Sequence, residues 1–336
     1  MKSIEKYIAT YFLKTKSILE KYNTNNIIKL QFFQRHNQAL LGGMNEVLEL
    51  LEKYTDISKY QIKYLPEGTI INAKEIVLEL EGKYQYFGIM EGLIDGILSR
   101  STTIATNAYE CVQAAKGKPI IFMGDRMDHF LMQERDGDAI RLAGVNIMST
   151  DAQNLPNSQL EPFGSYPHAL IQNFNGDIKA VTKAYYEIFP QENVISLIDY
   201  HNDVIRDARL SYEAIGDKLW GVRVDTSASM KDHMFDNEED NPKFYGVNVE
   251  QIKRLRKALD QMGANNVKIT VSSGFTPAKI KEFEDNDTPV DFYGVGQFIF
   301  QPRCYFSADA TVLNDQNQAK EGRQYQNNSR LIIYSK

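Results

Sequence analysis

The chain has 336 residues, of which 43% are apolar and 24% are charged, and this composition excludes a disordered or collagen-like protein. Because 44 acidic residues outnumber 38 basic ones, the net charge of −6 excludes a general positive field that would hold nucleic acid or an anionic membrane. The two cysteines, Cys111 and Cys304, exclude a disulfide framework and a four-cysteine zinc site, and they fit a cytoplasmic protein.

The first segment, residues 1–22, carries Lys and Glu throughout and therefore lacks the apolar core of a signal peptide. We interpret it as an amphipathic segment. Elsewhere no apolar run approaches the roughly 18–20 residues needed to cross a bilayer, so we expect no membrane span and no membrane partner.

Residues 1–117 predict a small α+β domain. A helical pattern covers residues 45–52, and a turn at 66–69 precedes alternating apolar residues at 76–80. A long helical pattern then runs from Glu91 to Ala115 and ends at Gly117, which is typical of a helix C-terminus.

From Pro119 onward, short apolar runs alternate with helical stretches. The runs cover residues 119–124, 144–150, 193–200, 218–227, 266–274 and 289–296. This alternation predicts parallel strands covered by helices, in a barrel or a doubly wound sheet. Several runs end in polar residues, and α/β barrels place their active sites at the carboxyl ends of their strands, so we favour a barrel over residues 118–297. We expect the acidic stretch between Met230 and Asn248, which includes residues 236–240, and the stretch from Asn314 to Ser329 to lie on the surface.

Two carboxylates, Asp199 and Asp225, end the third and fourth of these runs. At one rim they could hold Mg²⁺ through a diphosphate, or the hydroxyls of a sugar. Helix N-caps after each strand are an equally good interpretation, and the pattern alone leaves both open.

Glycine turns follow the last two runs. Ser272, Ser273 and Gly274 lie between a strand and a helix, where free backbone N–H groups bind anions, and Gly294 and Gly296 form a similar turn. An ordinary turn is the alternative for each, but two such turns on consecutive strands favour a phosphate site.

Arg126, Arg141 and Arg223 lie at or near strand ends, where a guanidinium suits a carboxylate or a phosphate, although surface arginines are commoner. His168 follows a Gly-Ser turn and a proline, and it is either a structural hydrogen-bonding residue or a functional one. The other histidines share no metal-ligand spacing, so we expect no zinc or iron site.

Taken in order, these segments resemble the nicotinate phosphoribosyltransferase family, in particular its shorter archaeal and bacterial branch. The matching segments extend over nearly the whole chain: YF at Tyr11, QFF at Gln31, PEGTI at Pro66, LSRSTTIAT at Leu98, FMGDR at Phe122, GSYPHALIQ at Gly164, GVRVDTS at Gly221, VKITVSSGF at Val267, DFYGVG at Asp291 and AKEGRQY at Ala319.

The resemblance implies a type II phosphoribosyltransferase fold, an irregular α/β barrel whose N-terminal domain is completed by residues 298–336. It implies transfer of phosphoribosyl from phosphoribosyl pyrophosphate (PRPP) to nicotinate, coupled to ATP hydrolysis through a phosphohistidine at His168, with Mg²⁺ as cofactor. It also implies a homodimer or higher oligomer with shared active sites.

The site residues follow from the matching positions. His168, Asp199 and Asp225 are the expected catalytic residues, and the two aspartates are also the candidate Mg²⁺ ligands. The expected substrate-binding residues are Tyr11, Thr106, Arg126, Ser165 and Arg223, with Tyr11 covering the pyridine ring from a neighbouring subunit. The expected phosphate-binding residues are Ser272, Ser273, Gly274, Gly294 and Gly296.

Three departures from the family pattern affect these expectations. Ser273 stands where many relatives have glycine, Arg126-Met127 replaces an Arg-Arg pair, and Cys304 alone leaves no zinc knuckle. The missing arginine keeps a nicotinamide or quinolinate phosphoribosyltransferase open as an alternative. Together with the altered glycine turn, it also leaves open a catalytically silent relative that binds a nucleotide or a phosphosugar.

Overall fold

The computed structural model describes residues 4–23, 25–156 and 162–335, and its contacts divide the chain into two compact units. Unit 1 comprises Met1–Asn107, Arg141–Ala143 and Gln301–Lys336, and unit 2 comprises Ala108–Ile140 and Gly144–Phe300. The division cuts the long helix α3 (Glu91–Ala114) at Asn107, whereas the predicted boundary after residue 117 follows the end of that helix.

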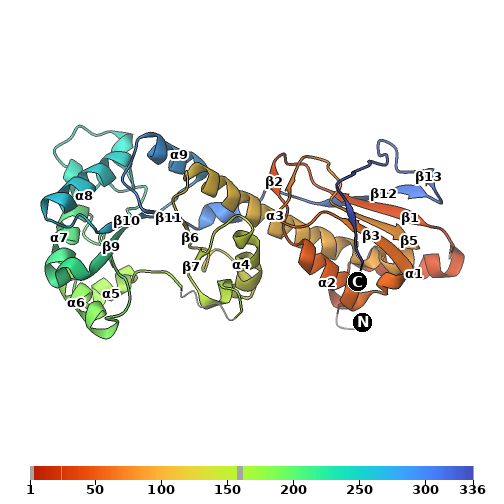
Figure 1. The fold of residues 1–336 in the computed structure, drawn as a ribbon, viewed down its shortest axis with the longest axis horizontal. Coiled ribbons are helices and arrows are strands. Elements are labelled where there is room, and N and C mark those ends of the chain that lie inside the picture. The colour runs from red at the N-terminus through yellow and green to blue at the C-terminus, as the bar shows by residue number, and fades with distance from the viewer. Residues whose placement is uncertain (1–3, 24, 157–161, 336) are drawn as a thin grey trace. The chain divides into compact units, whose positions relative to one another are not determined.

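Unit 1 is an antiparallel sheet covered by helices on one face (Figure 1). The strand order is β13-β12-β1-β5-β3-β14. The strands are β1 (Ile28–Phe33), β3 (Tyr60–Tyr64), β5 (Leu78–Gly82), β12 (Ser307–Leu313), β13 (Gln316–Asn317) and β14 (Ile332–Ile333), with a separate pair of β2 (Ala39–Leu40) and β4 (Ile70–Ile71). The C-terminal β12 pairs with β1, so the end of the chain contributes to the N-terminal α+β layer.

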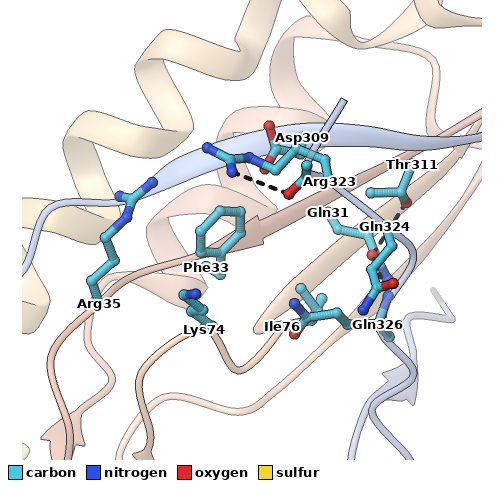
Figure 2. A pocket seen from close by; sticks show the side chains of 11 residues that line it. Gln31, Phe33, Arg35, Lys74, Ile76, Asp309, Thr311, Arg323, Gln324 and Gln326 are labelled. Atoms are coloured by element: carbon cyan, nitrogen blue, oxygen red, sulfur yellow. Dashed lines mark hydrogen bonds and ion pairs between the residues drawn. The ribbon is translucent and has the colours of Figure 1, made fainter. Parts of the chain in front are cut away.

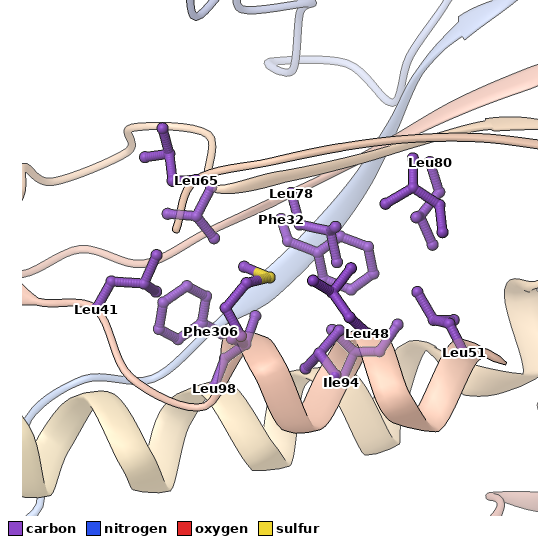
Figure 3. Packing of buried hydrophobic residues seen from close by; sticks show 14 of the residues in the cluster. Phe32, Leu41, Leu48, Leu51, Leu65, Leu78, Leu80, Ile94, Leu98 and Phe306 are labelled. Carbon is purple, nitrogen blue, oxygen red and sulfur yellow. The ribbon is translucent and has the colours of Figure 1, made fainter. Parts of the chain in front are cut away.

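The core of unit 1 lies between this sheet and the helices α2 (Met44–Tyr54) and α3 (Figure 3). Alternate strand residues point into it because successive side chains of a strand point to opposite faces. Phe32, Leu78 and Leu80 meet Leu48 and Leu51 in this way, and all five are buried. The preceding helix α1 (Thr10–Tyr22) buries only Phe12, and Tyr11, Ile18 and Tyr22 are exposed.

Unit 2 is built on a six-stranded parallel sheet in the order β7-β6-β11-β10-β9-β8. All six predicted strands are present: β6 (Ile120–Phe122), β7 (Ile147–Met148), β8 (Val194–Leu197), β9 (Leu219–Val224), β10 (Lys268–Val271) and β11 (Phe292–Val295). The helices of this region are α4 (Gln133–Arg141), α5 (His168–Asn173), α6 (Ile178–Ile188), α7 (Val204–Ile215), α8 (Val249–Gln261) and α9 (Pro277–Asp285). The predicted α/β class is therefore confirmed, as a curled half-barrel in which β7 and β8 are the end strands of the described sheet.

The segment between Met230 and Asn248 is more firmly anchored than a surface loop. Phe235 and Phe244 are buried with their ring centroids 4.5 Å apart, and the buried Asp232 accepts a hydrogen bond from the Val204 backbone. The prediction that this segment lies on the surface was wrong for these residues, because Phe235 and Phe244 pack against each other although most of their neighbours in the sequence are polar. Most of the acidic residues at 236–240 are exposed, as predicted.

Among the helices that the structure describes, none combines the length and the apolar character that crossing a lipid bilayer requires.

Candidate active site

The carboxyl ends of the six parallel strands surround a cavity of about 560 Å³ in unit 2. Ten of the predicted site residues line it: Arg126, Ser165, His168, Arg223, Asp225, Ser272, Ser273, Gly274, Gly294 and Gly296. They come from strand ends far apart in the sequence, because parallel strands bring all their carboxyl ends to one edge of the sheet.

Arg223 is the centre of a hydrogen-bond network in this cavity. It donates from Nε to Ser272 Oγ (3.0 Å), from Nη1 to Ser165 Oγ (3.3 Å) and from Nη2 to Asp225 Oδ2 (3.1 Å). Ser272 Oγ in turn donates to Asp225 Oδ1 at 2.6 Å, which closes a triangle of side chains between β9 and β10. Both charged side chains of the pair are about one-fifth exposed, so this network holds the cavity wall in one geometry.

His168 is the first residue of α5 and lies at the mouth of the cavity, with its side chain 46% exposed. Its Nε2 is 3.2 Å from both carboxylate oxygens of Asp199, which follows β8 and is almost fully buried. This hydrogen bond raises the pKa of His168, and the charges of Asp199 and Asp225 act in the same direction, while burial and Arg223 oppose them. A carboxylate paired with an imidazole in this way orients the ring and stabilises its charged form.

The turn after β10 presents consecutive left-handed residues. Ser273 has φ of 75° and Gly274 has φ of 70°, and a Cβ at Gly274 would meet no atom within 4 Å. Lys279 on α9 donates from Nζ to Ser273 O at 3.4 Å, and burial lowers the pKa of this lysine. Ser273 therefore keeps the conformation that a glycine would adopt, and the Ser-Ser-Gly sequence retains a glycine-type turn.

The end of β11 and the turn that follows it require glycine at positions 294 and 296, because a side chain at either would come too close to neighbouring atoms. A Cβ at Gly296 would lie 2.4 Å from the backbone oxygen of Met123, and one at Gly294 would lie 2.6 Å from the Met123 side chain and 3.1 Å from Ser272 Cβ. Glycine is required here for close approach of neighbouring strand ends rather than for a positive φ, since neither residue has one.

Arg126 differs from Arg223. It is exposed at the cavity, and within the described part of the chain its guanidinium has no protein partner. A guanidinium without a partner binds a carboxylate or a phosphate readily, because no internal ion pair has to be broken. Arg141, the third arginine considered from the sequence, ends α4 and does not line the cavity.

Two predicted substrate-binding residues lie in unit 1 and do not line this cavity. Tyr11 is on α1 and is 62% exposed. Thr106 on α3 is fully buried, where its hydroxyl accepts from Leu40 N (3.0 Å) and donates to Thr102 O (2.6 Å). The hydroxyl of Thr106 thus has local partners that account for its burial.

Sequence reasoning missed several lining residues. Asp125 and Ser149 follow β6 and β7, Phe163 approaches from an irregular segment, and Gln297 follows the second glycine turn. Asp125 and Gln297 directly adjoin residues that the sequence had selected, so proximity along the chain was the available signal. No sequence signal of this kind marks Phe163 as a lining residue, because its position depends on packing against Trp220 of β9 and Phe292 of β11.

Among the residues that the structure describes, no three His, Cys, Asp or Glu side chains come together as a metal site. Asp225, which lines the cavity, is paired with Arg223, and Asp199, which does not line it, is paired with His168. Carboxylate oxygens are the ligand type that Mg²⁺ uses when substrate phosphates and water supply its other ligands. The residues present therefore fit Mg²⁺ held jointly with a phosphorylated substrate, and not a metal held by protein alone.

A second cavity, of about 600 Å³, lies in unit 1 on the sheet face opposite the helices (Figure 2). Its wall carries the cations of Arg35, Lys74 and Arg323, of which Arg323 is paired with Asp309 at 2.8 Å. The buried Gln31 forms its floor and binds the C-terminal stretch through Gln326. Three cations and one carboxylate therefore line this cavity, together with the apolar Phe33 and Ile76.

Comparisons with known sequences identify the group of proteins to which these features belong. Residues 10–102 match the model of the quinolinate phosphoribosyl transferase N-terminal domain. Two nicotinate phosphoribosyltransferases of Mycobacterium tuberculosis are similar to the chain: pncB2 is 25% identical over 236 residues, and pncB1 is 26% identical. The chain spans about half of the length of these relatives, 46% and 48% respectively.

Solved structures extend the similarity to the whole chain. The nicotinate-nucleotide pyrophosphorylase of Pyrococcus furiosus is 30% identical, with a TM-score of 0.82 over 98% of this chain and 82% of that one. Human nicotinic acid phosphoribosyltransferase shares the fold, with a TM-score of 0.70 at 15% identity over 95% of this chain and 77% of that one. The chain therefore belongs to the pyridine phosphoribosyltransferase family, in which the nicotinate and quinolinate enzymes share a type II phosphoribosyltransferase fold.

Proposed function

We propose that the protein is a nicotinate phosphoribosyltransferase of NAD salvage that acts in the cytoplasm. It transfers phosphoribosyl from PRPP to nicotinate and releases pyrophosphate, with coupled hydrolysis of ATP. The observation that carries this proposal is the contrast between the two cavity arginines: Arg223 is saturated by protein partners, whereas Arg126 has none in the described structure.

The count of free cations favours nicotinate over the other pyridines. One guanidinium matches the single carboxylate of nicotinate. Quinolinate has two carboxylates, and among the described lining residues only one guanidinium without a protein partner could pair with them; nicotinamide has no charge to pair with Arg126. The names of the M. tuberculosis relatives also support nicotinate, whereas the match of residues 10–102 to the quinolinate phosphoribosyl transferase N-terminal domain keeps quinolinate as the second candidate.

The transfer step requires stabilisation of charge more than a strong base. As the bond from the anomeric carbon to pyrophosphate breaks, positive charge develops on the ribose and negative charge on the leaving group. Asp225 is held towards the cavity by Arg223 and Ser272, so its carboxylate can face the ribose. The turns at Ser273–Gly274 and Gly294–Gly296 offer backbone N–H groups for the ribose 5′-phosphate. Mg²⁺, when bound, neutralises the diphosphate, and Asp199 and Asp225 are the residues that would contact it.

His168 is the residue through which ATP hydrolysis would be coupled. When Asp199 accepts a hydrogen bond from Nε2, the lone pair of the imidazole lies on Nδ1. That nitrogen would attack the γ-phosphorus of ATP, the bond to the ADP oxygen would break, and water would later release phosphate from the histidine. Asp199 would stabilise the charged phosphoimidazole.

A second copy of the chain is expected to complete the site. Tyr11 lies exposed on unit 1, and an aromatic ring that covers the pyridine must come from a surface that can reach the cavity. We therefore infer a homodimer or higher homo-oligomer in which Tyr11 of one copy serves the cavity of another.

Product formation from each of nicotinate, nicotinamide and quinolinate, with PRPP and Mg²⁺ and with or without ATP, tests the proposal. We expect nicotinate mononucleotide, faster with ATP, and a weaker response to the other pyridines by tenfold or more. Arg126→Ala should reduce this preference, with Arg141→Ala as a matched arginine variant outside the cavity. Preference for quinolinate would move the protein to the other branch of the family, and ligand-induced stabilisation without turnover by any pyridine would identify a silent binding protein.

The coupling is tested separately. His168→Ala should abolish ATP hydrolysis and leave slow, ATP-independent transfer. Unchanged ATP turnover in this variant would assign His168 a structural role.

A further inference from the structure

The irregular segment 162–167 contributes five residues to the cavity lining, at positions 163–167, but belongs to no helix or strand, so its contacts with neighbouring elements must fix its position. Its one deeply buried side chain is Tyr166, which is 3% exposed and lies between Ser165 and the start of α5. The Tyr166 ring packs in a small apolar cluster with Ile171, Ile178 and Leu197. Packing of this kind holds the ring, but it does not by itself fix where the hydroxyl points.

The hydroxyl of Tyr166 enters a buried network of hydroxyl groups. It lies 2.7 Å from Ser196 Oγ on β8 and 3.2 Å from Thr182 Oγ1 on α6. Ser196 Oγ is in turn 2.7 Å from Ser211 Oγ on α7, which donates to the backbone oxygen of Asp207 at 2.9 Å. Removing one of these hydroxyl groups leaves a neighbouring buried hydroxyl without one of its hydrogen bonds, so the network is sensitive to the loss of any single group.

The network joins two elements that also meet at the cavity. Ser196 lies three residues before Asp199, and Tyr166 lies two residues before His168. The same segment and the same strand are therefore connected twice: by Tyr166 and Ser196 in the interior, and by His168 and Asp199 at 3.2 Å at the cavity mouth. His168 is nearly half exposed, so water competes for its bond to Asp199, whereas the bond between Tyr166 and Ser196 is buried.

We propose that Tyr166 is a positioning residue that holds His168 against Asp199, and Ser165 against Arg223, through its buried bond to Ser196. This inference rests on the proposed function of His168, although the geometry on which it depends is independent of catalysis. Tyr166 itself does not touch the reacting atoms through its hydroxyl, because that group points into the interior network. Its effect passes through the backbone to its neighbours on either side.

The test compares two Tyr→Phe variants in the same part of the fold. Tyr166→Phe removes the network hydroxyl and keeps the ring. Tyr185→Phe is the matched control, because its ring lies 5.8 Å from that of Tyr166 while its hydroxyl binds Glu192 outside the network. Ser196→Ala removes the same bond from the other side.

We expect Tyr166→Phe and Ser196→Ala to lower kcat of the ATP-coupled reaction about tenfold, with KM for nicotinate within about twofold, and to speed amide hydrogen exchange in residues 164–168. Tyr185→Phe should change neither quantity. Wild-type kcat and wild-type exchange in a folded Tyr166→Phe protein would overturn the proposal, as would a loss of activity with exchange unchanged. If the wild-type protein shows no transferase activity, the proposed function fails, and the exchange comparison still decides whether Tyr166 positions the segment.

Discussion

The left-handed turn at Ser273 and Gly274 allows a prediction in which two single changes have opposite signs. Ser273 has φ of 75°, and this conformation costs a residue with a Cβ roughly 1–2 kcal/mol relative to its relaxed backbone. Replacement by glycine removes that cost, but it also adds about 0.4–1 kcal/mol of conformational freedom to the unfolded chain. The difference predicts that Ser273→Gly stabilises the protein by about 0.5–1 kcal/mol.

The neighbouring residue supplies the opposite change. Gly274 has φ of 70° and open space around its missing Cβ, so Gly274→Ala introduces backbone strain without a steric clash. We expect it to destabilise the protein by about 1 kcal/mol. Because the two residues are adjacent in one turn, the comparison isolates the backbone conformation from burial and packing.

Thermal unfolding of the two variants beside the wild type is the measurement. We expect Ser273→Gly to raise Tm and Gly274→Ala to lower it, each by about 1–4 °C for a chain of this size. Ser273→Gly should also leave KM for PRPP within about twofold, because the backbone amides keep their directions. A fall in Tm for Ser273→Gly would refute the reasoning, since it would mean that the serine side chain contributes more than its conformation costs.

Three further changes test other parts of the molecule. Burial raises the pKa of Asp95 to about 7, so the ionisation of this carboxyl group increasingly opposes folding as pH rises from about 4 to above 7. Asp95→Asn should therefore stabilise the protein by about 1–2 kcal/mol at pH 8 and by less towards pH 5. A gain in Tm that does not change with pH would contradict this expectation. Gln31→Ala should lower the free energy of unfolding in urea by about 2–3 kcal/mol, because it removes four hydrogen bonds, two of them buried and two partly buried. Gln324→Ala, at an exposed residue, should cost less than about 0.5 kcal/mol. Gly296→Ala should raise KM for PRPP at least tenfold, because its Cβ would overlap a backbone oxygen at 2.4 Å, and Gly164→Ala, where space is open, should leave KM near the wild-type value.

The strands of unit 2 could be predicted because their signal is local. Each is a short apolar run bounded by turn residues, and all six appear in the sheet. The order in which they pair depends on contacts between distant parts of the chain, so the strand pattern alone fits a barrel or a doubly wound sheet, and the polar strand ends and the family resemblance were needed to favour the barrel. The buried pair of Phe235 and Phe244 was missed for the same reason, because each phenylalanine lies in a polar stretch and only their mutual packing buries them.

The sequence pattern does not distinguish the roles of the two arginines of the candidate site. Arg126 and Arg223 are alike in sequence, since each lies at or near a strand end, and either could have been the residue that pairs with a substrate carboxylate. The structure separates them: Arg223 donates to three side chains of the cavity wall, and exchanging these bonds for a ligand would leave Asp225 without its cation. Leaving the Asp225 carboxylate without its cation would cost more free energy than a new bond from Arg223 to a ligand would gain. Arg223 is therefore suited to holding the shape of the cavity, and Arg126 to binding the ligand. Lysine in place of Arg223 should therefore disturb both Ser165 and Ser272, since a single ammonium cannot reproduce the fork that joins them.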